Sequence, residues 1–154
     1  LYKQVREDAS YSGVGLAEYL TIFRKWEGDE ESWIPINNKT REKFPLEKWQ
    51  EWASPVWMDI QRTDVLNNVE GTETGDEKHI APLQLSVIER AVYMWSNPGE
   101  TVFTPFAGIG SELYQSVLCG RKAVGIELKE GYFQTAIKNL ERAYLKNSQM
   151  SLAL

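Results

Sequence analysis

The stretch TVFTPFAGIGSELYQSVLCGRKAVGIEL, residues Thr101 to Leu128, sets the fold class of this 154-residue chain. It opens with an apolar segment typical of a strand and continues through a glycine-containing turn. The residues from Ser111 to Leu118 are compatible with a helix that Gly120 ends, and Ala123 to Ile126 predict a second strand that leads into Glu127. A strand, a helix and a strand in this order predict an α/β fold with a Rossmann-like sheet.

The turn and the acid have the chemistry of a nucleoside site. Gly108 and Gly110 lack Cβ atoms, so they allow tight dihedral angles and a close approach of the backbone to a ligand. Glu127 follows the second strand about 20 residues later, where a carboxylate can accept hydrogen bonds from both hydroxyls of a ribose. Leu113 replaces the third small residue of a dinucleotide motif, and Glu112 would repel a phosphate. These residues favour an adenosine ligand without phosphates.

Three segments in a fixed order resemble the amino-directed DNA methyltransferases, which methylate adenine N6 or cytosine N4 with S-adenosylmethionine. Residues 104–110, TPFAGIG, are similar to the family's D-P-F-x-G-x-G cofactor motif. Residues 79–90, HIAPLQLSVIER, resemble its H-P-x-x-K-P-x-x-L-x-E-R segment, which precedes the glycine motif in the permuted class. Residues 120–128, GRKAVGIEL, match the segment that carries the acid. The whole chain most resembles phage and prophage members.

The resemblance assigns roles to individual residues. Glu127 would hold the ribose, Leu128 and Phe106 would flank the adenine, and the methionine end would lie near Ala81, Thr104 and Ala107. Asp64 and Asn67 are further candidates for the methionine end. The full cofactor-binding set implied by the resemblance is His79, Ala81, Pro82, Thr104, Pro105, Phe106, Ala107, Gly108, Gly110, Glu127 and Leu128. The target base would leave the DNA duplex, and its exocyclic amine would attack the methyl group directly.

Two departures from the family pattern matter for activity. Thr104 stands where the family has an acid that contacts the methionine amino group, so this contact would be weak or absent. The catalytic tetrapeptide, in which Asp, Asn or Ser precedes Pro-Pro and an aromatic residue, is missing. Ser54-Pro55-Val56-Trp57 is the nearest string, and a loop proline beside a buried tryptophan is the preferred interpretation. The catalytic residues are therefore unknown, and we expect a C-terminal portion that binds cofactor without turnover.

The chain divides into three regions. Residues 1–25 predict a β-hairpin of the catalytic sheet, with a strand at 18–25, and its loop holds Ser10, Tyr11 and Ser12 as candidate substrate-binding residues, although an ordinary turn is the preferred interpretation. Residues 26–75 form a tryptophan-rich segment where, by the resemblance, the permuted class places its target-recognition insert; the alternative is a connector that packs onto the sheet. Aromatic side chains can stack on bases, but five tryptophans in one small insert favour a minor core. Residues 76–154 form the predicted cofactor-binding region.

Three more helices are expected. Residues Leu46 to Trp52 are compatible with one short helix. Residues Leu85 to Trp95 carry apolar side chains at helical spacing and end before Asn97-Pro98-Gly99. A final helix at about 131–145 should cover the sheet with its apolar positions as core, namely Phe133, Ala136, Ile137, Leu140 and Tyr144, and should fray beyond Asn147.

Composition limits the other classes of function. The net charge of −5 gives no general basic surface for nucleic acid, so DNA contact would need a local patch or another part of the protein. A single Cys119 suits a reducing cytoplasm, of a bacterium or a phage-infected host, and is interpreted as a small core side chain. One His and one Cys cannot build a zinc site, so no metal is expected. No apolar run is long enough to span a membrane.

We expect double-stranded DNA with a flipped base as substrate, the N-terminal catalytic part of the same protein as a partner, and a possible homodimer. Two alternatives remain open at this point. One is an inactive cofactor-binding module or regulatory subunit, and the other is a methyltransferase that acts on RNA or on a small molecule. The sequence does not choose between adenine N6 and cytosine N4.

Overall fold

The computed structural model describes residues 18–25, 28, 34–36, 44–66 and 82–152, without the side chains of 150–152. The chain divides into two units, Leu1–Ile34 and Pro35–Leu154, and each is described by itself. All helices and strands of the described residues belong to the second unit. The predicted site residues His79 and Ala81, and the loop residues Ser10, Tyr11 and Ser12, lie outside the described residues, as does Asn67.

The centre of the second unit is the predicted strand, helix and strand. Strand β1 (Thr101–Thr104) leads through the turn into helix α4 (Ser111–Leu118), and strand β2 (Lys122–Gly125) follows after Gly120. The two strands are parallel, with Phe103 beside Val124. Gly120 has a φ of +75°, a left-handed conformation that glycine adopts without strain at the end of a helix. The sequence prediction for this stretch is confirmed.

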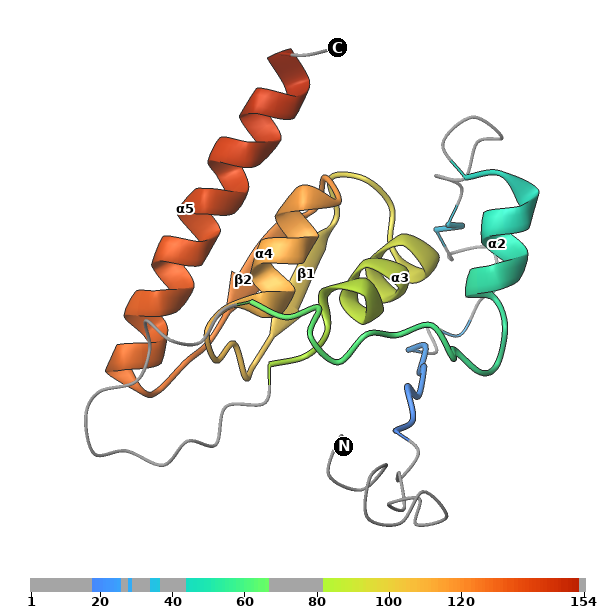
Figure 1. The fold of residues 1–154 in the computed structure, drawn as a ribbon, viewed down its shortest axis with the longest axis horizontal. Helices are drawn as coiled ribbons and strands as arrows, with labels where there is room; N and C mark the ends of the chain where they lie inside the picture. The colour runs from blue at the N-terminus through green and yellow to red at the C-terminus, as the bar shows by residue number, and fades with distance from the viewer. Residues whose placement is uncertain (1–17, 26–27, 29–33, 37–43, 67–81, 153–154) are drawn as a thin grey trace, which may run out of the picture. The chain divides into compact units, whose positions relative to one another are not determined.

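Three further helices surround this centre (Figure 1). Helix α3 (Leu85–Trp95) and helix α5 (Glu130–Leu152) pack on either side of α4, which covers one face of the strands. Helix α2 (Leu46–Trp52) begins after Pro45 and has the predicted bounds. Helix α5 begins one residue earlier and runs seven residues further than the predicted 131–145, so the predicted fraying beyond Asn147 is not seen in its backbone. Within the described residues, no helix is long and apolar enough to cross a membrane.

The core lies between α3, α4 and the covered face of the sheet. Ile88 and Val92 of α3 pack with Cys119, and Val102 of β1 adds to this cluster. Burial raises the pKa of the Cys119 thiol to about 12. The thiol therefore stays protonated and behaves as a small apolar side chain, as the sequence predicts.

The tryptophan-rich segment contributes a second, aromatic cluster. The rings of Phe44, Trp52 and Tyr93 lie 5.3 to 6.4 Å apart, centre to centre. The guanidinium of Arg90, on α3, lies 5.7 Å from the ring of Trp52 and 5.1 Å from the ring of Trp57. Both distances allow a cation–π attraction. Of the three described tryptophans of this segment, Trp52 and Trp57 belong to this small core, whereas Trp49 is 43% exposed, so the predicted minor core is wrong for Trp49.

Two further expectations about this fold are wrong. The described residues 18–25 form no strand, so the predicted hairpin strand is absent there. Helix α5 packs chiefly on α4 and buries Thr135, Ala136, Asn139 and Ala143. Small side chains let two helices approach closely, so the larger Phe133, Ile137 and Tyr144 remain exposed instead of forming the core.

Candidate cofactor site at the carboxyl ends of β1 and β2

Parallel strands end at the same edge of a sheet, and here the glycine turn and the acid meet at that edge. The ladder continues past the strands, since the Ile126 amide donates to the Thr104 carbonyl at 3.0 Å and the Ala107 amide donates to the Ile126 carbonyl at 2.9 Å. These bonds hold the turn after β1 against the residues that follow β2. They place Glu127 next to Gly108.

Glu127 is hydrogen-bonded directly to the turn. Its Oε2 accepts from the Gly108 amide at 2.8 Å, and its Oε1 accepts from the Lys129 amide at 2.9 Å. Two backbone donors therefore fix the carboxylate before any ligand is present. Each carboxylate oxygen offers two acceptor sites, so each retains one for a further donor. The sequence predicts that the turn and the acid lie together, and this hydrogen bond confirms their proximity.

Both glycines of the turn adopt left-handed backbone conformations. Gly108 has φ +53° and Gly110 has φ +87°, where a side chain would be strained. Gly110 also lies under α5, because a Cβ atom there would be 3.1 Å from Cα and Cβ of Ala136. Asn139 secures the same turn, since its Nδ2 donates to the Ile109 carbonyl at 2.9 Å. Helix α5 thus holds the turn in place through Ala136, which packs on Gly110, and through Asn139, which binds the Ile109 carbonyl.

The remaining described candidates differ in exposure. Phe106 and Leu128 lie beside the buried turn and expose 84% and 97% of their surface. Ala107 is buried beneath the turn, where a Cβ on Gly125 would be 2.9 Å from its Cβ. Thr104 accepts a hydrogen bond from the Phe106 amide at 3.3 Å, so its hydroxyl closes the turn locally.

Pro105 is exposed within the turn, and Pro82 is half-buried just before α3. Among the described residues, no group of three or more His, Cys, Asp and Glu side chains could hold a metal ion.

The start of α4 disfavours a phosphate. Burial raises the pKa of the Glu112 carboxyl in the first turn of this helix. When ionised, this carboxylate opposes an anion at the helix N-terminus, where a dinucleotide would place its pyrophosphate. The structure thus places Glu112 where the sequence argument against a phosphate needs an acid, while the raised pKa of this carboxyl reduces its repulsion of an anion.

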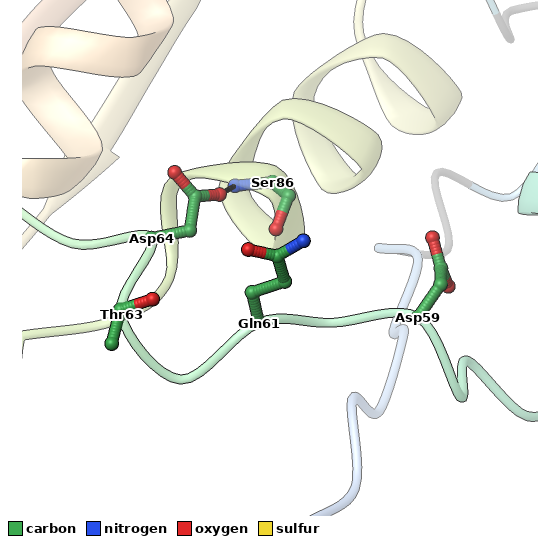
Figure 2. A pocket seen from close by; sticks show the side chains of 5 residues that line it. All are labelled: Asp59, Gln61, Thr63, Asp64 and Ser86. Atoms are coloured by element: carbon green, nitrogen blue, oxygen red, sulfur yellow. Dashed lines mark hydrogen bonds between the residues drawn. The ribbon is translucent and has the colours of Figure 1, made fainter.

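A polar pocket of about 480 Å³ lies between the segment 59–64 and the start of α3, as Figure 2 shows. The backbone carbonyl of Asp64 accepts from the Leu85 amide at 2.8 Å, and its Oδ2 accepts from the Ser86 amide at 2.9 Å. Asp64 therefore caps α3 from a distant part of the chain. Sequence reasoning missed this role, because the capping residue is 22 positions away from the amide that it binds.

The string Ser54-Pro55-Val56-Trp57 forms a local turn. The Ser54 hydroxyl donates to the Val56 carbonyl at 2.9 Å, and the Trp57 indole donates to the Trp52 carbonyl at 3.0 Å. The Ser54 hydroxyl and the Trp57 indole therefore both donate hydrogen bonds to nearby backbone carbonyls. This geometry supports the interpretation of the string as a structural loop.

The family model described as DNA methylase matches residues 9–138. This chain belongs to the N6/N4 DNA methyltransferase family. A type II methyltransferase of Methanothermobacter thermautotrophicus, M.MthZI, is 31% identical over 123 residues, which cover 75% of this chain and 32% of that protein. The type II methyltransferase M.BglI of Bacillus subtilis is 27% identical over 142 residues, 91% of this chain and 35% of its own length.

Solved structures of a family relative agree with the fold. The putative DNA modification methylase TTHA0409 from Thermus thermophilus matches with a TM-score of 0.51 and 30% identity, over 80% of this chain and 41% of that one. The same protein complexed with S-adenosyl-L-methionine matches with a TM-score of 0.51 and 25% identity, over 88% and 49%. The mixed α/β unit is thus part of a Rossmann-like methyltransferase fold. This chain spans about a third of the length of the two curated relatives.

Proposed function

We propose that this chain is the cofactor-binding part of a DNA methyltransferase that transfers a methyl group from S-adenosylmethionine to adenine N6 or cytosine N4. The observation that carries the proposal is the 2.8 Å hydrogen bond between the Gly108 amide and Glu127 Oε2. This bond joins the two features that an adenosyl ligand needs, namely a glycine turn that a ligand can approach closely and an acid that can bind the ribose hydroxyls. The relative that has been solved with S-adenosyl-L-methionine supports the choice of cofactor.

The residues of the site fit such a ligand. Glu127 retains an acceptor on each oxygen for the ribose hydroxyls. The exposed side chains of Phe106 and Leu128 offer apolar surface for the adenine ring. We propose that Thr104, Ala107 and the preceding segment with His79, Ala81 and Pro82 surround the methionine end. S-adenosylmethionine, when bound, supplies the methyl group, and these residues bind and orient it.

Transfer also needs a group that positions the target amine. The tetrapeptide that does this in the family is missing from residues 1–154, and Ser54 is used in a local turn. We propose that a further part of the same protein, N-terminal to these residues, supplies it, and that residues 1–154 alone bind cofactor without turnover. The greater length of M.MthZI and M.BglI supports this division. The same absence favours a second candidate, an inactive cofactor-binding module.

Calorimetry with S-adenosylmethionine tests the site. The Glu127→Ala variant should bind about 1 to 3 kcal/mol more weakly, because it loses charge-assisted hydrogen bonds. Glu130→Ala is the matched control, since Glu130 is an exposed acid at the start of α5 that pairs with Gln134. An unchanged dissociation constant for Glu127→Ala, with the fold intact by circular dichroism, would refute the ribose assignment.

Activity assays separate the two candidates and the substrate class. The complete polypeptide that carries residues 1–154 should transfer labelled methyl groups to unmethylated duplex DNA. RNA and free nucleosides serve as competing substrates in the same assay. Label on RNA alone would exclude the DNA assignment, and cofactor binding without any transfer would favour the inactive module.

A further inference from the structure

Glu112 is a half-buried acid in the first turn of α4, directly after the glycine turn. No Lys, Arg or His side chain of the described residues forms an ion pair with its carboxylate. Burial disfavours the charged form and raises the pKa of this carboxyl. A half-buried carboxylate without a partner costs free energy, so a cation bound beside it would stabilise the ionised form.

The side chain of Glu112 lies on the side of α4 that faces α3. The two helices pack together (Figure 1), and their ends meet where the Arg121 guanidinium donates to the Ser96 carbonyl at 2.7 Å. Cys119, at the end of α4, packs with Val92 of α3. Glu112 precedes Cys119 by two helical turns, so it points to the same side of α4 and lies beside the start of α3. Helical side chains lean toward the N-terminus, which directs this carboxylate to the edge of the sheet that carries the glycine turn.

The ligand of the proposed site would extend to this position. Glu127, assigned to the ribose, and Leu128, assigned to the adenine, both follow β2. From there a ligand lies across the carboxyl ends of the strands toward β1. Val102 of β1 packs against the core residues of α3, so the β1 side of the sheet is the α3 side. The amino-acid end of S-adenosylmethionine would therefore lie near the start of α3 and the α3-facing side of α4.

Other polar groups at this edge are already engaged. Glu127 accepts hydrogen bonds from two backbone amides and is assigned to the ribose. Asp64 caps α3 through the Ser86 amide. Thr104 is uncharged, and its hydroxyl accepts a hydrogen bond from a backbone amide. Glu112 is an acid that has no such partner among the described residues, and the amino group of the cofactor is a cation that needs one.

We propose that Glu112 binds the α-ammonium group of S-adenosylmethionine through a charge-assisted hydrogen bond and so recognises the amino-acid end of the cofactor. Such a bond is stronger than one between neutral groups. The proposal rests on the proposed function and deepens it, because the glycine turn and Glu127 recognise the adenosyl part alone. Adenosyl compounds without an amino-acid end should therefore bind this site weakly.

Calorimetry with three ligands on wild type and Glu112→Gln tests this role. S-adenosylhomocysteine keeps the ammonium group but lacks the sulfonium charge, and 5′-methylthioadenosine lacks the whole amino-acid part. Glutamine keeps the size of the side chain and removes its charge. The variant should bind S-adenosylmethionine and S-adenosylhomocysteine about tenfold more weakly, and methylthioadenosine within about twofold of wild type, because the lost bond involves the ammonium group.

Glu89→Gln is the matched control. Glu89 is a half-buried acid of α3 that lies near Cys119, at the other end of the helix pair. Its removal changes the charge by the same amount, and all three ligands should bind as they do to wild type. Circular dichroism checks that both variants keep the fold.

Several outcomes would overturn the proposal. An equal loss of affinity for all three ligands would give Glu112 a structural role, and a loss for S-adenosylmethionine alone would place it at the sulfonium. A selective loss in Asp64→Asn, with none in Glu112→Gln, would assign the ammonium group to Asp64. Wild type gives a test without any variant, since S-adenosylhomocysteine and methylthioadenosine that bound it equally well would exclude recognition of the ammonium group.

The proposed function fails separately. If wild type bound none of the three ligands, the adenosyl site itself would be refuted, and the role of Glu112 with it. If wild type bound S-adenosylmethionine and Glu112→Gln bound it equally well, the cofactor assignment would stand and the role of Glu112 alone would be refuted.

Discussion

Gly110 satisfies two requirements that no other residue type meets together. Its φ of +87° lies in the left-handed region, and the space above its Cα is filled by Ala136 at 3.1 Å. The first requirement concerns the backbone alone, and the second concerns the packing of α5. The sequence indicated the first through the turn motif, but the second depends on a helical residue far along the chain.

Gly110→Ala should lower the free energy of unfolding by about 2 to 4 kcal/mol, because backbone strain and a clash add together. Urea denaturation measures the change. Gly120→Ala is the matched control, since its φ of +75° gives the same strain while nothing lies within 4 Å of the added Cβ. The control should cost only about 1 to 2 kcal/mol. Equal losses for the two variants would contradict the role assigned to Ala136.

At the scale of elements, α3 depends on Asp64 for its first turn. The carboxylate accepts from the Ser86 amide, and the backbone carbonyl accepts from the Leu85 amide. Asp64→Ala should cost about 1 kcal/mol in urea denaturation, because the cap is lost. Asp64→Asn retains an acceptor and should cost less. If Asp64→Ala instead weakened S-adenosylmethionine binding without a loss of stability, Asp64 would belong to the methionine end of the site.

Most of the helices and strands could be predicted from local sequence patterns. Helix α2 and helix α3 have their predicted bounds, and the stretch 101–128 folds as expected, because glycine, capping and apolar spacing act within a few residues. The buried side of α5 was predicted wrongly. Apolar side chains at helical spacing indicated the core, and Ala136 is buried as predicted, but the other buried residues of α5 are Thr135, Asn139 and Ala143, while Phe133, Ile137 and Tyr144 are exposed. Which side of an amphipathic helix becomes buried depends on the helix that packs against it, here α4.

At the scale of the whole unit, one buried cation ties the segment 44–59 to α3. The side chain of Arg90 is 5% exposed, and its Nη1 donates to Asp59 Oδ1 at 3.1 Å, while Nη2 also binds Asp59 and lies 3.5 Å from Glu51. A pairing across 31 residues leaves no local pattern, so sequence reasoning did not find it. Burial of an unpaired guanidinium is costly, which makes Asp59 important for stability.

This pair predicts a loss of stability in acid. The hydrogen bond from Arg90 lowers the pKa of Asp59 below its ordinary value of 3.8. A lowered pKa in the folded state stabilises the fold above the unfolded value, and this contribution disappears as the pH falls through the folded value. Urea denaturation of wild type and Asp59→Asn should therefore differ at about pH 6 and converge below pH 3.8.

Glu47→Gln serves as the control for this series, because Glu47 is an exposed acid in the first turn of α2. It should follow wild type closely across the whole range. A gap between wild type and Asp59→Asn that stayed constant down to about pH 2.5 would show that the carboxylate's charge is not what stabilises the pair.

Gly125 has a wider consequence for the sequences that this fold can accept. A Cβ there would be 2.9 Å from Cβ of Ala107 and 3.1 Å from both methyl groups of Leu113. The space between strand and turn thus has room for a single methyl group, which residue 107 already provides. Alanine at 125 should need glycine at 107 and also a displaced or smaller side chain at 113, so these three positions are expected to covary among natural homologues.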